Sequence, residues 1–179
     1  MDGYLFFDTV TPESRIALFE LVEDELLRLA AVTVSGSVAA FAAYSAPDVR
    51  SAYALVEAVA GTVGPPSARL LAVNGLHDDR PVAPGMQKFK GERLIALVLL
   101  QVPLSRAEEV AGLAGRIGSA RAAVVLGSSV TVVVEVDGAT LDELELRLAD
   151  VLAVAGEAKS DVLVTTTELG TGWGGPQSQ

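Results

Sequence analysis

The sequence predicts an α+β protein built from two consecutive βαββαβ units that pack through their antiparallel sheets. Three observations lead to this prediction. The same order of strand-like and helix-like segments occurs twice, apolar positions of the two copies coincide after a shift of 91 or 92 residues, and several strands are apolar on both faces. The predicted boundaries are residues 1–74 for the first unit, 75–92 for a linker, 93–169 for the second unit and 170–179 for a flexible tail.

The first unit begins with a strand at residues 4–10, followed by a helix for which Thr11 is a suitable N-cap and Pro12 a suitable first residue. Apolar residues then recur at helical spacing: Phe19, Val22, Leu26 and Leu29. Further strands are expected at residues 31–34, 38–44 and 68–74. A second helix opens near Asp48 and presents an apolar face made of Val49, Ala52, Val56 and Val59, and residues 61–66 break the chain after it.

The second unit repeats this order. Strands are expected at residues 93–102, 120–126, 130–136 and 160–166. Pro103 and Ser105 open a helix that runs to Ile117, and Thr140 with Glu143 forms a capping box for the last helix. The apolar face of that last helix consists of Leu141, Leu144, Leu148 and Val151.

Strands that are apolar on both faces indicate that both faces of the sheet are covered. The strand at residues 130–136, VTVVVEV, shows almost no polar alternation, although a sheet with one wet face should alternate. Two helices cover one face of a βαββαβ sheet, and a large exposed apolar patch on the other face is avoided in monomers. We therefore expect the two sheets of the chain to face each other, while the alternative is sheet pairing between chains.

Composition and charge exclude several classes of protein. The net charge is −10, which opposes binding to nucleic acid, and the absence of cysteine excludes disulfides and thiolate metal sites. No apolar run approaches the length of about 20 residues that spans a bilayer. The N-terminus, MDGYLFFDTV, lacks the features of a signal peptide. We expect a cytoplasmic protein without membrane contact, metal or other cofactor.

The segment VLGSSVTVVVEVDGATLDELELRLADVLAVAGEAKSDVLVTT, at residues 125–166, resembles the effector-binding (RAM) domain of Lrp/AsnC regulators. The first copy, from VSGSVAAFAAYSA onward, resembles it more weakly. This resemblance implies ferredoxin-like units that pair through their sheets and bind amino acids or other small effectors at subunit interfaces. The topology also resembles dimeric α+β barrel proteins, which include small monooxygenases.

The chain departs from the RAM pattern in two ways. A helix-turn-helix normally precedes that domain and binds DNA, whereas here a strand is expected to begin at residue 4. The central hairpin of the family reads Gly, any residue, an aromatic residue and Asp. Here Gly127 is followed by Ser128, Ser129 and Val130, and Gly36 is followed by Ser37, Val38 and Ala39. The first departure, together with the acidic charge, argues against direct binding to nucleic acid. The second departure, in which the aromatic residue and the Asp are missing from both hairpins, argues against recognition of an amino-acid ammonium.

Candidate ligand-binding residues lie at the two hairpins and at the start of two helices. The hairpin candidates, which could hydrogen-bond a ligand through hydroxyls or backbone N–H groups, are Ser35, Gly36, Ser37, Gly127, Ser128 and Ser129. Ordinary turn chemistry is the simpler explanation of these residues, because glycine permits a positive φ at a hairpin and serine is common in turns. Arg15 and Arg106 occupy equivalent first-turn positions and could clamp a carboxylate, or they could form surface ion pairs.

The sequence favours a non-catalytic module that senses an amino acid or small carboxylate, or binds a protein, because no polar catalytic set is evident. The alternative is a cofactor-independent enzyme of the dimeric α+β barrel class that acts in an apolar cavity. That alternative would need a titratable group such as Tyr44, Tyr53 or His77. The expected partners are a small-molecule effector, a protein and further copies of the same chain.

Overall fold

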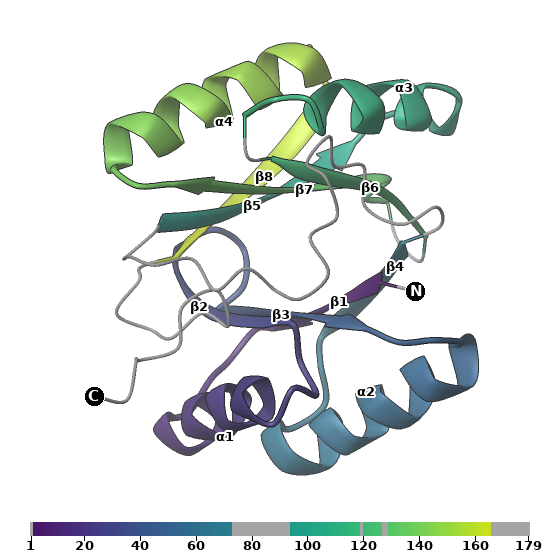
Figure 1. The fold of residues 1–179 in the computed structure, drawn as a ribbon, viewed down its shortest axis with the longest axis vertical. Coiled ribbons are helices and arrows are strands. Elements are labelled where there is room, and N and C mark those ends of the chain that lie inside the picture. Colours follow the sequence, from purple (N-terminus) through teal and green to yellow (C-terminus); the bar gives the residue numbers. More distant parts are fainter. Residues whose placement is uncertain (1, 73–93, 119, 127–128, 166–179) are drawn as a thin grey trace.

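The structure is a computed structural model, and it describes residues 2–72, 94–118, 120–126 and 129–165. The first half comprises β1 (Asp2–Phe7), α1 (Pro12–Glu23), β2 (Leu29–Ser35), β3 (Ala40–Ser45), α2 (Val49–Val63) and β4 (Ala68–Ala72). The second half comprises β5 (Leu94–Gln101), α3 (Leu104–Ala114), β6 (Arg121–Leu126), β7 (Val132–Gly138), α4 (Leu141–Ala155) and β8 (Lys159–Thr165). The predicted order of elements is confirmed in both halves (Figure 1).

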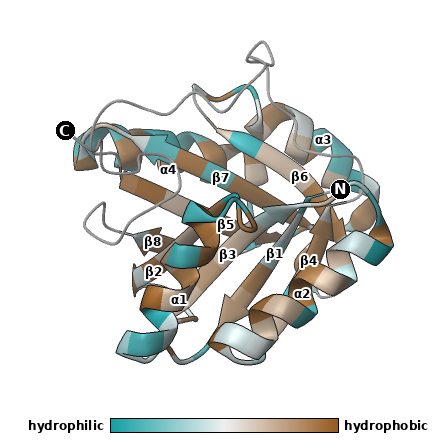
Figure 2. Cartoon of the chain, turned by 60° about the horizontal axis from the view of Figure 1, so that its bottom comes forward, coloured by the Kyte–Doolittle hydropathy of each residue, from teal (hydrophilic) through white to brown (hydrophobic). Residues whose placement is uncertain are grey.

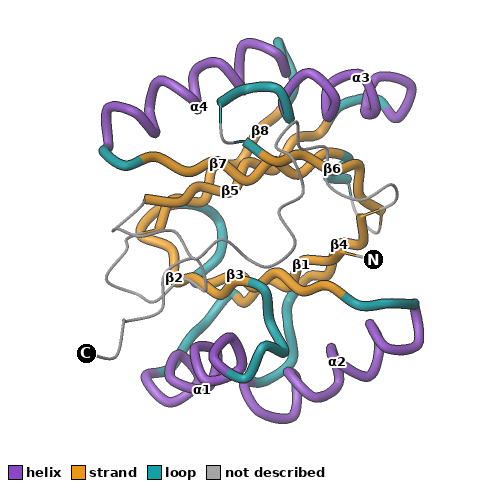
Figure 3. Tube along the Cα trace, viewed as in Figure 1, coloured by secondary structure: helices purple, strands orange, loops and turns teal. Residues whose placement is uncertain are grey.

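The strands of the described residues form one closed antiparallel barrel in the order β1-β3-β2-β8-β5-β7-β6-β4. Each half contributes four neighbouring strands, and the halves join where β2 pairs with β8 and β4 pairs with β6. Helices α1 and α2 lie outside the first-half strands, and α3 and α4 lie outside the second-half strands on the opposite side (Figures 1 and 3). The α+β class and the intrachain packing of the two sheets are confirmed.

Figure 2 shows that the central strands are mostly apolar, and strands such as β5 and β7 are buried on both faces. Strand β5 illustrates the arrangement. Ile95, Leu97 and Leu99 belong to a cluster inside the barrel, whereas Ala96, Val98 and Leu100 pack under α3 and α4. The interior cluster also contains residues of the first half, including Phe6, Leu29 and Phe41. The doubly apolar strands are therefore explained by helices on one face and the opposite sheet on the other.

Side-chain caps fix the starts of three helices. Thr11 accepts a hydrogen bond from the Ser14 backbone N–H and precedes Pro12, as predicted. Asp48 accepts from the Ser51 N–H at the start of α2. Thr140 accepts from the Glu143 N–H, but the Glu143 carboxylate accepts from the N–H of Ala139, one residue before the cap. These caps satisfy N–H groups that have no partner within a helix.

The predicted extension of the first helix is wrong. Helix α1 ends at Glu23, Leu26 is exposed and Leu29 opens β2. The N–H groups of Leu26 and Leu27 both donate to the carbonyl of Leu21, which closes the helix before those residues. The predicted ends of the other two helices are also wrong, because α2 continues to Val63 through Gly61 and α3 stops at Ala114.

The strand bounds are shifted by a few residues from the predicted ones, and β1 ends at Phe7 rather than at residue 10. The predicted linker at residues 75–92 and the tail at residues 170–179 lie outside the described residues. Within the described ranges, no helix has the length and hydropathy needed to cross a membrane.

Candidate functional site

A buried carboxylate lies inside the barrel. Glu135 occupies β7, where Val133 and Glu135 point inward and Val134 and Val136 point toward the helices. Its side chain is 1% exposed among apolar residues of both sheets. A charged group in such a position requires charge-matched partners, because burial of an unpaired carboxylate is strongly unfavourable.

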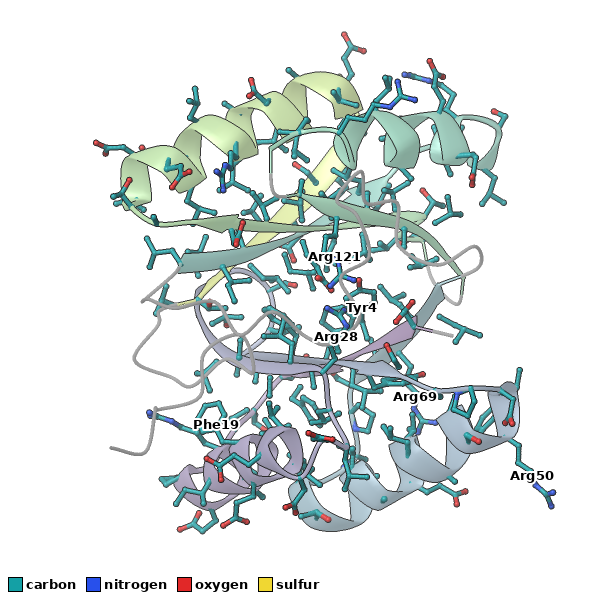
Figure 4. The ribbon with its side chains drawn as sticks, viewed as in Figure 1. Tyr4, Phe19, Arg28, Arg50, Arg69 and Arg121 are labelled. Atoms are coloured by element: carbon teal, nitrogen blue, oxygen red, sulfur yellow. The ribbon has the colours of Figure 1, made fainter. Side chains whose placement is uncertain are left out.

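Three side chains meet the Glu135 carboxylate. Arg28 binds it with both terminal nitrogens, at 2.9 Å from Nη1 to Oε2 and through a second hydrogen bond from Nη2 to Oε1. The Tyr4 hydroxyl donates to Oε1 at 2.9 Å, and Arg121 Nη1 lies 3.6 Å from Oε2. We call Tyr4, Arg28, Arg121 and Glu135 the barrel cluster. Figure 4 shows the labelled members lying between the two sheets.

The barrel cluster joins the two halves of the chain. Tyr4 pairs with Ala43 across β1 and β3, and the backbone N–H of Arg28 donates to the Ala43 carbonyl at 2.7 Å, so the two residues lie on either side of Ala43 in the first half. Arg121 lies directly opposite Glu135 in the β6–β7 ladder. The ion pair between Arg28 and Glu135 therefore crosses the barrel from one half to the other.

Opposing electrostatic effects set the protonation of the cluster. Burial raises the pKa of Glu135, but the charge of Arg28 outweighs it, so the pKa is lowered from its ordinary value. Burial and the neighbouring Glu135 charge raise the pKa of Tyr4 well above its ordinary value. Burial lowers the pKa of Arg28, but the charge of Glu135 has the larger effect, so the pKa is raised above its ordinary value. At neutral pH Glu135 is therefore ionised, Arg28 is charged and Tyr4 is a neutral phenol.

Arg28 keeps one buried donor without an acceptor. Its Nε atom is shielded from solvent and has no hydrogen-bond partner among the residues that the structure describes, although both Nη atoms bind Glu135. The Arg28 side chain is 13% exposed and that of Arg121 is 23% exposed. The arginine side chains of the cluster are therefore partly exposed to solvent. The Arg28 Nε–H group can still donate a hydrogen bond to one further acceptor.

An open groove of about 720 Å³ lies on the outside of the barrel, between α1 and β2 with the end of the β2–β3 connection at Ala39. We call it the α1 groove. Its lining includes Val10, Pro12, Arg15, Ile16, Phe19 and Val32. The Arg15 guanidinium lies 5.9 Å from the centre of the Phe19 ring, which is a cation–π distance. One predicted site residue, Arg15, therefore borders a groove with apolar walls.

The two predicted arginines are not brought together. Arg15 lies on α1, and Arg106 lies on α3 at the opposite side of the barrel, where it is 3.8 Å from Glu109 (Figure 1). One small ligand cannot contact both side chains across the barrel. The individual ligand roles of Arg15 and Arg106 stay predictions.

The first hairpin packs against β8. Ser35 ends β2 and is exposed, and Ser37 donates a hydrogen bond to Asp161 of β8. Gly36 has a φ of 117°, and a Cβ there would lie 2.3 Å from Leu163 Cδ2, so both conformation and space require glycine. Their ligand roles stay predictions. In the second hairpin Ser129 is exposed, while Gly127 and Ser128 lie outside the described residues.

The two tyrosines named for an enzyme do not enter the barrel. Tyr44 is buried between the first sheet and its helices, Tyr53 is exposed on α2, and His77 lies outside the described residues. Among the residues that the structure describes, no group of three or more His, Cys, Asp or Glu side chains is placed to hold a metal ion.

Comparisons with known proteins give a likeness of fold. Neither a family profile nor a curated protein matches the chain. Among solved structures, a "putative monooxygenase" from Lactobacillus acidophilus is similar, with a TM-score of 0.51 over 93% of this chain and 95% of that chain. The two sequences are 6% identical, so the likeness shows a shared α+β barrel fold and nothing about activity.

All four members of the barrel cluster were missed by sequence reasoning. Glu135 was the available signal, because it is a lone acid within a run of valines that is expected to be buried. Its partners Arg28 and Tyr4 lie 107 and 131 residues away in sequence, and no local pattern connects them.

Proposed function

We propose that the protein is a non-catalytic module that binds a small carboxylate at the guanidinium side of the barrel cluster. The single observation that carries the proposal is the buried Nε–H of Arg28, which has no acceptor although Arg28 already binds one carboxylate. An unsatisfied buried donor costs about 1–3 kcal/mol, and an incoming carboxylate oxygen would remove that cost.

The chemistry of the cluster supports a carboxylate rather than a cation. Guanidinium groups match the planar geometry of carboxylates, and the cluster presents two of them around the one Glu135 carboxylate. An amino-acid ammonium would need a free acceptor, whereas both oxygens of Glu135 already accept hydrogen bonds. We therefore propose small carboxylates without an ammonium group as the preferred ligands.

The protonation states support binding over catalysis. A general base should have a pKa near the working pH, but the pKa of Glu135 is lowered and that of Tyr4 is raised far above neutrality. The resemblance to RAM domains agrees with an effector between two sheet-bearing units, here the two halves of one chain. Membership of that family, a protein partner and a homo-oligomer remain proposals.

Isothermal calorimetry with acetate, pyruvate and benzoate tests this function on three variants. Glu135→Gln keeps the shape but removes the negative charge that repels an incoming carboxylate. We therefore expect affinity to rise about tenfold, which corresponds to about 1.4 kcal/mol of relieved like-charge repulsion. Arg28→Lys keeps the charge but lacks Nε, so binding should be lost. Arg106→Gln changes an exposed arginine on α3 and serves as the matched control.

Circular dichroism would first establish that each variant is folded. Equal affinities in the wild type, Glu135→Gln and Arg28→Lys would overturn the proposal and leave the cluster as an ion pair that only stabilises the fold. Absence of binding to Glu135→Gln by every carboxylate in the panel would overturn it as well. Steady chemical conversion of a bound acid would favour the enzymatic alternative instead.

A further inference from the structure

Part of the apolar surface of helix α1 lies outside the core of the first half. Leu18 and Leu21 face the sheet and are buried. Ile16 and Phe19 line the α1 groove instead, and Ile16 is 59% exposed. Large apolar side chains that gather in a groove indicate a surface that is covered by something.

The last described residue of the barrel lies beside this groove. Thr165, the last residue of β8, pairs with Thr33 of β2, and Thr33 lines the α1 groove. Residues 166–179 follow directly from that point and lie outside the described residues. Trp173 is eight residues beyond Thr165, so an extended chain could carry it up to about 26 Å, which is about twice the diameter of a helix.

The composition of residues 166–179 suits the groove. Leu169 and Trp173 are its only large apolar residues, and Trp173 stands between Gly172 and Gly174 with no bulky neighbour. An indole ring buries about 150–250 Å² of surface and is attracted to a guanidinium. The groove offers both an apolar wall at Ile16 and Phe19 and the Arg15 guanidinium.

We propose that residues 166–179 dock in the α1 groove of the same chain, with the Trp173 ring seated against Ile16 and Phe19 beside Arg15. Docking covers the apolar side of α1 and holds the end of β8 against β2 at one of the two joints between the halves. The inference is independent of the carboxylate site, because it concerns the outer surface of α1.

Trp173 is the single tryptophan of the chain, so its fluorescence reports on this contact alone. We expect the full-length protein to show emission at shorter wavelength than free tryptophan and a severalfold lower quenching constant with acrylamide. Ile16→Glu should shift the emission toward that of free tryptophan and raise the quenching constant. Leu146→Glu, which places the same charge at an exposed leucine on α4, should change neither.

Hydrogen exchange gives a second reading that does not depend on a groove variant. Trp173→Ser should speed exchange of the α1 amides relative to those of α4. Solvent-like emission in the wild type, or an Ile16→Glu spectrum equal to the wild type, would overturn the proposal. Emission that shifts with protein concentration would place the ring in another copy and would also overturn the intrachain contact.

Discussion

Removal of the Arg28 side chain tests whether the cross-barrel ion pair holds the two halves together. In Arg28→Met, an apolar chain of similar length replaces the group that binds both oxygens of the fully buried Glu135. Deleting one partner of a buried pair costs about 3–5 kcal/mol, because the remaining charge stays buried. Tyr4 and Arg121 remain at the carboxylate, so we expect a loss near the lower bound, about 3 kcal/mol.

Urea unfolding monitored by circular dichroism measures this free energy of unfolding. The matched control is Arg106→Met, which removes an exposed pair to Glu109 and should cost about 0–1 kcal/mol. The double variant Arg28→Met/Glu135→Leu should recover about 2 kcal/mol or more relative to Arg28→Met, because the unpaired buried charge is gone. A loss in Arg28→Met no larger than in the control would refute the reasoning.

Three further predictions concern pH, close packing and a helix cap. The folded-state pKa of Glu135 lies below its ordinary value of 4.5, so its contribution to stability is present above pH 4.5 and is lost as the pH falls through the folded-state pKa. When urea midpoints are measured at decreasing pH, they should therefore decline more steeply in the wild type than in Glu135→Leu. Gly138→Ala should destabilise the fold by about 1–3 kcal/mol in thermal unfolding, since the new Cβ would lie 2.7 Å from the Leu144 backbone nitrogen. The control Gly112→Ala should stabilise slightly, because Gly112 lies within helix α3 and its new Cβ would have no neighbouring atom within 4 Å. Asp48→Ala should cost about 1 kcal/mol by removing the side-chain cap of α2, and an unchanged melting temperature would contradict that role.

The barrel was largely predictable from sequence because its causes are local and repeated. Residues 94–100 of β5 are apolar at every position, and this pattern requires cover on both faces. The helix caps at Thr11, Asp48 and Thr140 could be found from single residues and their neighbours. The sheet-against-sheet arrangement followed from these features without knowledge of any long-range contact.

The barrel cluster was not predictable in the same way. Extending the first helix to Leu29 placed Arg28 on a helix surface, where an arginine needs no explanation, whereas α1 actually ends at Glu23. Glu135 was visible as an acid among valines, but its partners come from the other half of the barrel. The site forms only when the barrel closes and brings the two halves together. The register in which the strands pair at closure depends on long-range contacts, which no local sequence pattern reveals.

The most direct test of the carboxylate proposal observes the Arg28 Nε–H group itself. A ¹H–¹⁵N spectrum of the arginine side chains, recorded while acetate is titrated, should show one slowly exchanging Nε–H signal that shifts and saturates and that is missing from Arg28→Lys. If the only signals that move are those of exposed arginines such as Arg106, and they move linearly with ionic strength, then the buried donor of Arg28 does not bind a carboxylate and the proposed function is contradicted.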